Sequence, residues 1–205
     1  MEVTVERGIW EVNCFQSFAS DDDRANVTSL FKWLSGRPEH RVVTWSGAAE
    51  DLPVFKTAAM EYGLKLPQQL RHLERDRLGW KHIDLAILLK AGSGTYVHQA
   101  ELAARLGLPS KMAGSAGQVP HLIEAGRVQD CAAISEVDVL LTSLLLAGHL
   151  VSLGEVASVN AAQFCTMRFV RNQRPFSSYH RELGNYLAKA ERQMIEDQTR
   201  WLQAS

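Results

Sequence analysis

The chain has 205 residues, 46% of them hydrophobic, which is enough to bury the core of one large domain or of one domain with a C-terminal extension. Its formal net charge is −1, so composition alone gives no attraction to nucleic acid or to an acidic membrane. A site for a polyanion therefore needs a local patch of basic residues or bound metal ions.

Cysteine usage and hydropathy indicate the compartment. Cys14, Cys131 and Cys165 are far apart and form no Cys-x-x-Cys pair, which favours a reducing environment over a disulfide framework. The N-terminus lacks the basic end and apolar stretch of a secretory signal. The longest apolar run, residues 137–153, is shorter than the roughly 18 to 20 residues that span a bilayer and carries Asp138. We therefore expect a cytoplasmic protein without a membrane-spanning segment.

The first sixty residues predict alternating strands and helices. Residues 3–14 alternate apolar and polar side chains, which predicts two strands joined by a tight turn. Residues 20–36 predict a helix with acids at its start and a glycine at its end. Residues 41–45 predict a short buried strand, and residues 52–62 predict an amphipathic helix that stops at Gly63.

The rest of the chain is predicted to be mainly helical. Residues 66–80 are polar and predict a surface excursion, and residues 81–89 fit both the end of a strand and the start of a helix. Further along the chain, the pattern predicts two short helices at residues 98–108 and 119–126 with a glycine-rich loop between them, a long apolar helix at 128–149, a basic connector at 168–178 and an amphipathic helix at 178–203. We predict an α/β domain over residues 1–155, followed by the connector and the C-terminal helix in residues 156–205.

Three acids in apolar surroundings are candidates for chemistry. In the stretch "TWSGAAEDLPVF", Asp51 lies where a strand ends and a helix begins, and Asp at a helix cap with Pro53 in the first turn is the simplest interpretation. Asp138 lies within the most apolar helix, where a lone buried carboxylate is costly unless it is paired or bound to a cation. The alternative is that it shares a polar face with Glu136. Asp84 allows the same two interpretations.

Four stretches in a fixed order carry a resemblance to a known family: "VVTWSGAAEDLPVFKTAAMEYGL", "KHIDLAILL", "ELAARLGLPSKMAGSAGQV" and "LIEAGRVQDCAAISEVDVLLTSLLL". Over residues 42–150, the chain resembles the predicted 3'-5' exonucleases related to the proofreading domain of DNA polymerase B. The resemblance implies an RNase H-like fold, with a mixed central sheet flanked by helices. It also implies acids that hold two divalent cations, Mg²⁺ or Mn²⁺, for phosphodiester cleavage.

The resemblance assigns roles to individual residues of this chain. It places Asp51 on the family's second motif and Asp138 on its third, both as catalytic metal ligands, and it gives Asp84 an assisting role. It assigns contacts with nucleic acid to the turn and loop residues Ser46, Gly47 and Lys111, although an ordinary exposed lysine is the alternative for Lys111. The implied ligand is single-stranded or frayed DNA.

The family pattern is incomplete in this chain. No Asp-x-Glu motif precedes the first strand pair, so two expected carboxylates are missing. The third-motif Tyr, four residues before Asp138, is replaced by Ile134, and Ala133 stands where an alternative His would lie. Loss of such a water-orienting group lowers a rate by about two to four orders of magnitude. Two explanations stay open: a first strand encoded upstream of Met1, or a pseudonuclease that keeps the fold for binding. We predict impaired catalysis.

Two further features complete the sequence predictions. Arg168, Arg171 and Arg174 recur every third residue around Phe169, which predicts a phosphate-contacting stripe beside a stacking aromatic, or else a solvated helix face or a connector. His82 is a candidate to support the acid that follows it. The alternative function is a structural or regulatory subunit that binds a protein partner, or a second copy of itself, through the C-terminal helix.

Overall fold

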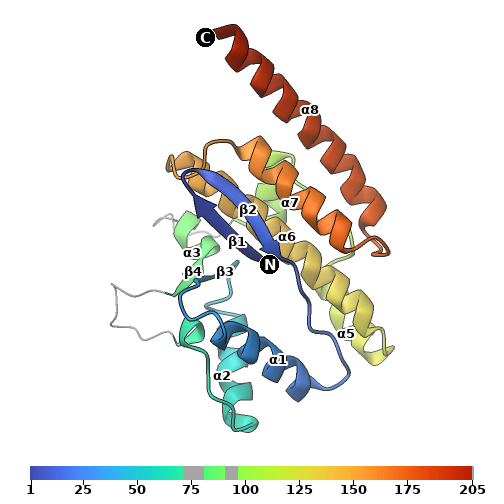
Figure 1. The fold of residues 1–205 in the computed structure, drawn as a ribbon. Coiled ribbons are helices and arrows are strands. Elements are labelled where there is room, and N and C mark those ends of the chain that lie inside the picture. Colours follow the sequence, from blue (N-terminus) through green and yellow to red (C-terminus); the bar gives the residue numbers. More distant parts are fainter. Residues whose placement is uncertain (72–80, 91–96, 205) are drawn as a thin grey trace. The chain divides into compact units, whose positions relative to one another are not determined.

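The computed structural model describes residues 1–71, 81–90 and 97–204 of the chain (Figure 1). Its contacts divide the chain into two compact units, one made of Met1–Ser17 with Ala100–Ser205 and the other of Phe18–Gln99. The first unit thus joins the N-terminal strands to the C-terminal helices. The predicted boundary at residue 155 stays a prediction.

The Phe18–Gln99 unit follows the predicted order of elements. It contains α1 (Asp23–Ser35), β3 (Val42–Thr44), α2 (Asp51–Glu61), a 3-10 turn (Gln68–Leu70), β4 (His82–Asp84) and α3 (Leu85–Lys90). The side chain of Asp22 caps α1 by accepting from the Ala25 N–H at 3.1 Å, as the acids at its start predicted. Residues 81–89, which fitted both the end of a strand and the start of a helix, contain a strand that leads directly into a helix.

In the core of the Phe18–Gln99 unit, α1 and α2 pack against the 3-10 turn. Its buried members are Phe31, Leu34, Leu52, Ala59 and Leu70. The surface excursion predicted for residues 66–80 therefore begins with a buried turn, and residues 72–80 lie outside the described part of the chain. Burial of each large apolar side chain contributes about 1.5–3 kcal/mol relative to exposure.

Strands β3 and β4 pair in parallel, with Val42 opposite His82 and Thr44 opposite Asp84. The connection between them contains α2, so the segment is a strand-helix-strand crossover. In such a unit both strands end at the same edge of the sheet, and the loops that follow them meet there. The turn after Thr44 and the acid at the end of β4 are brought together in this way.

The other unit combines a hairpin with six helical elements. They are β1 (Glu2–Glu6), β2 (Ile9–Cys14), α4 (Gln99–Leu106), a 3-10 turn (Ala116–Gln118), α5 (Val119–Glu124), α6 (Val128–Ser152), α7 (Val159–Gln173) and α8 (His180–Ala204). The predicted hairpin is confirmed: β1 and β2 are antiparallel, and Arg7 and Gly8 form the turn with φ values of 52° and 80°.

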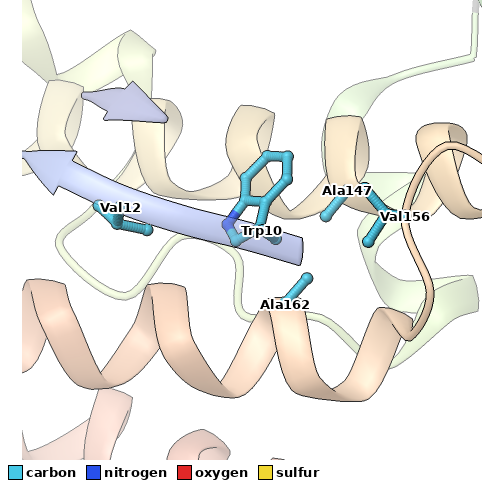
Figure 2. Packing of buried hydrophobic residues seen from close by; sticks show 5 residues of the cluster. All are labelled: Trp10, Val12, Ala147, Val156 and Ala162. Carbon is cyan, nitrogen blue, oxygen red and sulfur yellow. The ribbon is translucent and has the colours of Figure 1, made fainter. Parts of the chain in front are cut away.

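Trp10 is the centre of this unit's core (Figure 2). Figure 2 shows its side chain and that of Val12 on β2, with Ala147 of α6 and Ala162 of α7 close to the indole ring. The indole N–H donates to the hydroxyl of Thr166 at 2.8 Å, so its polar atom is satisfied inside the core. The hairpin is thereby fixed between α6 and α7.

Two predictions about the fold have different outcomes. The described residues form two separate two-stranded sheets and do not show the central sheet of an RNase H-like fold, so this sheet stays a prediction. The connector at 168–178 needs correction, because α7 continues to Gln173. The arginines between its apolar residues made the helical spacing of those residues hard to recognise in the sequence. Ala162, Met167 and Val170 are buried on one side of α7.

Helix α6 is the most apolar element of the structure. With 25 residues it is three residues longer than predicted, and by length and composition it could cross a membrane. Half of its most apolar window is buried inside the structure, and the core helix of a globular protein passes the same test. Cytoplasmic localisation stays a prediction.

Candidate functional site

Asp84 organises the edge where β3 and β4 end. Its Oδ1 accepts from the backbone N–H groups of Ser46 at 2.9 Å, Ala86 at 3.0 Å and Ile87 at 3.3 Å, and its Oδ2 accepts from the Ala48 N–H at 2.9 Å. Three of these N–H groups share Oδ1 and one bonds to Oδ2, so the carboxylate is held by main-chain donors. Asp84 therefore caps α3 and closes the turn after β3, and its assisting role in metal binding stays a prediction.

The turn after β3 is built by close backbone packing. Ser46 has a left-handed backbone conformation with φ of 58°. A Cβ on Gly47 would lie 2.5 Å from Oγ1 of Thr44, so only glycine fits there. The same Oγ1 lies 2.8 Å from Nε2 of His82, which supports the turn through Thr44. Contact of Ser46 and Gly47 with nucleic acid stays a prediction; the Ser46 N–H is already bonded to Asp84.

Asp51 is not the cap of α2. The helix begins at Asp51 itself, and Glu50 occupies the capping position without a side-chain hydrogen bond. The Asp51 side chain is exposed and makes no hydrogen bond or ion pair with any described residue. Partial desolvation by the surrounding protein, followed by the neighbouring carboxylates of Glu50 and Asp84, raises the pKa of Asp51 above its usual value. The role of Asp51 as a metal ligand stays a prediction.

On α6 the buried acid is Glu136, whereas Asp138 is exposed. Two residues subtend about 200° on an α-helix, so the two side chains point to opposite faces and do not share a polar one. Asp138 forms no side-chain bond or ion pair with a described residue, and desolvation by the surrounding protein raises its pKa. The interpretation of Asp138 as the costly buried carboxylate is therefore wrong, and that description fits Glu136.

Glu136 is the acceptor of a network that sequence reasoning missed. Its Oε1 accepts from the Ser17 hydroxyl and from Nε of Arg174, each at 2.7 Å, and its Oε2 accepts from the Tyr179 hydroxyl at 2.6 Å. The Arg174 guanidinium also lies 5.0 Å from the ring centroid of Phe15. The network ties the middle of α6 to the end of α7 and to the segment after β2.

Tyr179 acts in this network as a neutral donor. Its side chain is fully buried. Burial, and then the hydrogen bond to Glu136, raise the pKa of its hydroxyl well above 10.0. The phenol therefore stays protonated over the whole physiological range. An acid within an otherwise apolar helix was the one signal in the sequence that could have indicated such a network.

The glycine-rich loop packs on α6 one turn before Asp138. A Cβ on Gly114 would lie 3.3 Å from the side chain of Ile134, which is itself buried. Lys111 is exposed in the same loop, with a left-handed φ of 56°, and its carbonyl accepts from the Gly114 N–H at 3.2 Å. The position of the missing Tyr is thus covered by backbone, next to an exposed lysine.

The three arginines of α7 do not form one stripe. Arg168 lies over the ring of Phe164 at 5.7 Å, Arg174 is bonded to Glu136, and Arg171 packs against Gly184 of α8. The stacking aromatic predicted between them is absent as well, because Phe169 packs against the Trp10 core cluster. Arg168 and Arg171 remain candidates for phosphate contact, whereas Arg174 has an internal partner.

A comparison with protein families decides where the chain belongs. Residues 3–190 match the family described as predicted 3'-5' exonucleases related to the exonuclease domain of PolB. The chain belongs to this family. The match begins before and ends after residues 42–150, so the exonuclease-like family includes the hairpin and much of α8. No curated protein and no solved structure matches the chain.

Two of the assigned acids have the carboxylate chemistry that Mg²⁺ and Mn²⁺ prefer. Asp51 belongs to the Phe18–Gln99 unit and Asp138 to the other. Neither side chain forms a hydrogen bond or ion pair with a described residue. No group of three or more His, Cys, Asp or Glu side chains is found within residues 1–71, 81–90 and 97–204. The roles of Asp51 and Asp138 as metal ligands stay predictions.

Proposed function

We propose that this member of the exonuclease-like family binds single-stranded or frayed DNA and has impaired 3'-5' exonuclease activity. The observation that carries the proposal is a difference in hydrogen bonding and exposure among four of its acids. Both carboxylate oxygens of Asp84 and of Glu136 accept hydrogen bonds within the protein, whereas Asp51 and Asp138 are exposed and form no hydrogen bond or ion pair with a described residue. The acids that the family resemblance assigns to metal binding are the two that the fold leaves available.

The residues present fit a divalent cation only in part. Asp51 in one unit and Asp138 in the other each offer a carboxylate ligand, and a Mg²⁺ or Mn²⁺ ion bound by such ligands would activate a water and stabilise the leaving oxygen of the phosphodiester. Asp84 positions the turn that leads to Asp51, and Glu136 fixes the part of α6 that carries Asp138. Two free carboxylates are half of the four that the family resemblance implies, which supports weak metal binding.

The turn of α6 before Asp138 supports impaired catalysis. Ala133 and Ile134 are buried there and carry no group that can orient or deprotonate water. An enzyme that lacks this contribution is slower by about two to four orders of magnitude. Binding of DNA does not need this group, so the proposal keeps binding while it lowers the rate of cleavage.

Degradation of 5'-labelled single-stranded DNA with Mn²⁺ or Mg²⁺ tests the proposal. Asp138→Asn is compared with Asp130→Asn, a control on the same helix whose carboxylate pairs with Arg127 at 2.7 Å. We expect cleavage at or near background, and binding of the same oligonucleotide that falls steeply with salt. Efficient cleavage that only Asp138→Asn abolishes would show that catalysis is intact. Absence of binding at low salt would overturn the proposal as a whole.

A second candidate function is supported by α8. Asn160, near the start of α7, donates to Asp197 of α8, and α8 continues from there to Ala204, beyond the start of α7 (Figure 1). Ile195 on α8 and Phe176 in the turn before it are 53% and 99% exposed. A non-catalytic subunit could use these apolar side chains to bind a protein partner or a second copy. Size measurement by light scattering tests this, and a monomer that binds DNA excludes it.

A further inference from the structure

A groove of about 470 Å³ lies beside the first three turns of α8. Arg171 of α7 lines it, together with residues of α8 that include His180, Arg181, Gly184, Asn185 and Glu191. The charged groups are two guanidinium groups and one carboxylate. Glu191 is seven residues beyond Gly184, about 10 Å along the helix axis, so the end of the groove near Arg171 and Arg181 is positive.

Among the described residues, none is an acceptor for the Arg171 guanidinium. Its Nε is fully buried and has no hydrogen-bond partner, and within the described part of the chain the guanidinium forms no ion pair. A guanidinium carries five N–H donors, and a buried donor without a partner is unfavourable. Native proteins rarely leave such a group unsatisfied unless a ligand completes it. The neighbouring Arg181 is exposed and also has no ion pair with a described residue.

Gly184 makes room for this guanidinium. It lies inside α8, where glycine is among the least favourable residues for helix stability. A Cβ at this position would lie 3.2 Å from Nε of Arg171 and 3.6 Å from its Cζ and Nη2. The helix therefore carries an unfavourable residue at the point where the guanidinium lies flat against it. This arrangement keeps Arg171 at the floor of the groove.

Other groups around Arg171 are suited to an anion. His180 is the first residue of α8, and its Nδ1 donates to the carbonyl of Arg174 at 3.2 Å, which leaves Nε2 for another partner. Asn185 and Arg181 are exposed at the rim of the groove. The N-terminal end of a 25-residue helix adds a positive dipole.

We propose that this groove binds a backbone phosphate of the nucleic-acid strand, with Arg171 at its floor and Arg181 and Asn185 at its rim. The nature of the strand rests on the proposed function, whereas the phosphate chemistry rests on the groove itself. An open groove suits a phosphate that belongs to a longer polymer, since the strand can enter and leave along it. A free phosphate or a mononucleotide has the same chemistry and is separated by the test.

The test measures the affinity of the full chain for a fluorescent single-stranded oligonucleotide, by anisotropy in EDTA over a range of salt concentrations. Arg171→Gln is expected to weaken binding about tenfold and to lower the salt slope by about one. The control is Arg200→Gln, which removes the same charge from α8 at a side chain that lies 3.8 Å from Glu196. This control is expected to change affinity by less than about twofold.

Gly184→Ala separates binding from folding. The added methyl group displaces the Arg171 guanidinium without any change of charge, while alanine favours the helix. We expect several-fold weaker binding with an unchanged or higher melting temperature. Gly148→Ala is the matched control, because a Cβ there meets only a Val159 methyl group at 4.0 Å. Wild-type affinity in both Arg171→Gln and Gly184→Ala would overturn the inference.

The Arg171 Nε–H resonance in a ¹⁵N-correlated spectrum identifies the ligand. We expect it to shift with the oligonucleotide at micromolar concentration and with inorganic phosphate only at millimolar concentration. A shift with inorganic phosphate that the oligonucleotide does not displace would overturn the assignment to a strand. If the wild type binds no oligonucleotide, the proposed function is wrong. If the wild type binds and the groove variants bind with the same affinity, only the phosphate-binding groove is wrong.

Discussion

The edge where β3 and β4 end and the middle of α6 each combine an acid bonded within the protein with an acid that has no bond to a described residue. At the edge, backbone N–H groups hold Asp84, whereas Asp51 at the start of α2 is exposed. In α6, the side chains of Arg174 and Tyr179 hold Glu136 and leave Asp138 exposed. The first arrangement depends on the path of the main chain, and the second on side chains from distant elements. Substitution of partners can therefore dissect the second but not the first.

The largest expected effect is that of Asp84→Ala. It removes a charged acceptor of four backbone N–H groups and leaves those of Ser46 and Ala48 without it. We expect a loss of about 3–5 kcal/mol in the free energy of unfolding, measured by urea denaturation. Asp51→Ala is the control, and it should change stability by less than about 0.5 kcal/mol. Equal losses in both variants would show that the turn does not depend on Asp84.

Glu136→Gln should have the next largest effect. It removes the charge that the partly buried Arg174 faces, and breaking such a pair at one partner is strongly destabilising. We expect a loss of about 2–3 kcal/mol, again from urea denaturation. The double variant Glu136→Leu with Arg174→Met should recover much of this loss, because it leaves no unpaired charge. Failure of the double variant to recover stability would mean that Tyr179 and Ser17 dominate the network.

Tyr179→Phe tests the network through pH. Its hydroxyl bond is worth about 1–2 kcal/mol near pH 7. Because the pKa of Tyr179 in the folded protein is raised above 10.0, the unfolded chain loses this proton first as pH rises. The stabilising contribution is complete below pH 10.0 and falls above it by up to about 1.4 kcal/mol per pH unit. Denaturation at pH 7, 9 and 10.5 should show the two proteins converging at the highest pH, and a constant difference would contradict this.

Asp138→Asn should have the smallest effect on the free energy of unfolding, and it should raise this free energy where the other variants lower it. Desolvation raises the pKa of Asp138 in the folded protein, so the ionised form is disfavoured by folding at pH values above 3.8. Removal of the charge should therefore stabilise the protein at pH 7 by a few tenths of a kcal/mol, reduced by solvent screening of an exposed group. Below pH 3 the difference should vanish. A loss of stability at pH 7 would indicate an internal partner for Asp138.

Local rules were sufficient for most elements of the fold. The hairpin, the capped α1, and the length and apolar character of α6 agree with expectations from residues that are neighbours in sequence. The same rules misassigned α7, because closely spaced arginines hid a helical face whose buried residues become evident only when α6 packs on it. A central sheet was predicted from the family resemblance, and the two two-stranded sheets of the described residues do not show it.

The sequence shows which residue types stand at each motif and that the chain resembles the exonuclease-like family, to which the family comparison assigns it. The site residues named from this resemblance stay predictions, and Glu136 was not among them. Which carboxylates are bonded to other described residues became evident only when the chain was folded. Asp84 is bonded to a turn 38 positions away, and Glu136 to Ser17 119 positions away. Such bonds form where segments distant in sequence come into contact, and local rules such as helical periodicity and capping preference do not predict these contacts.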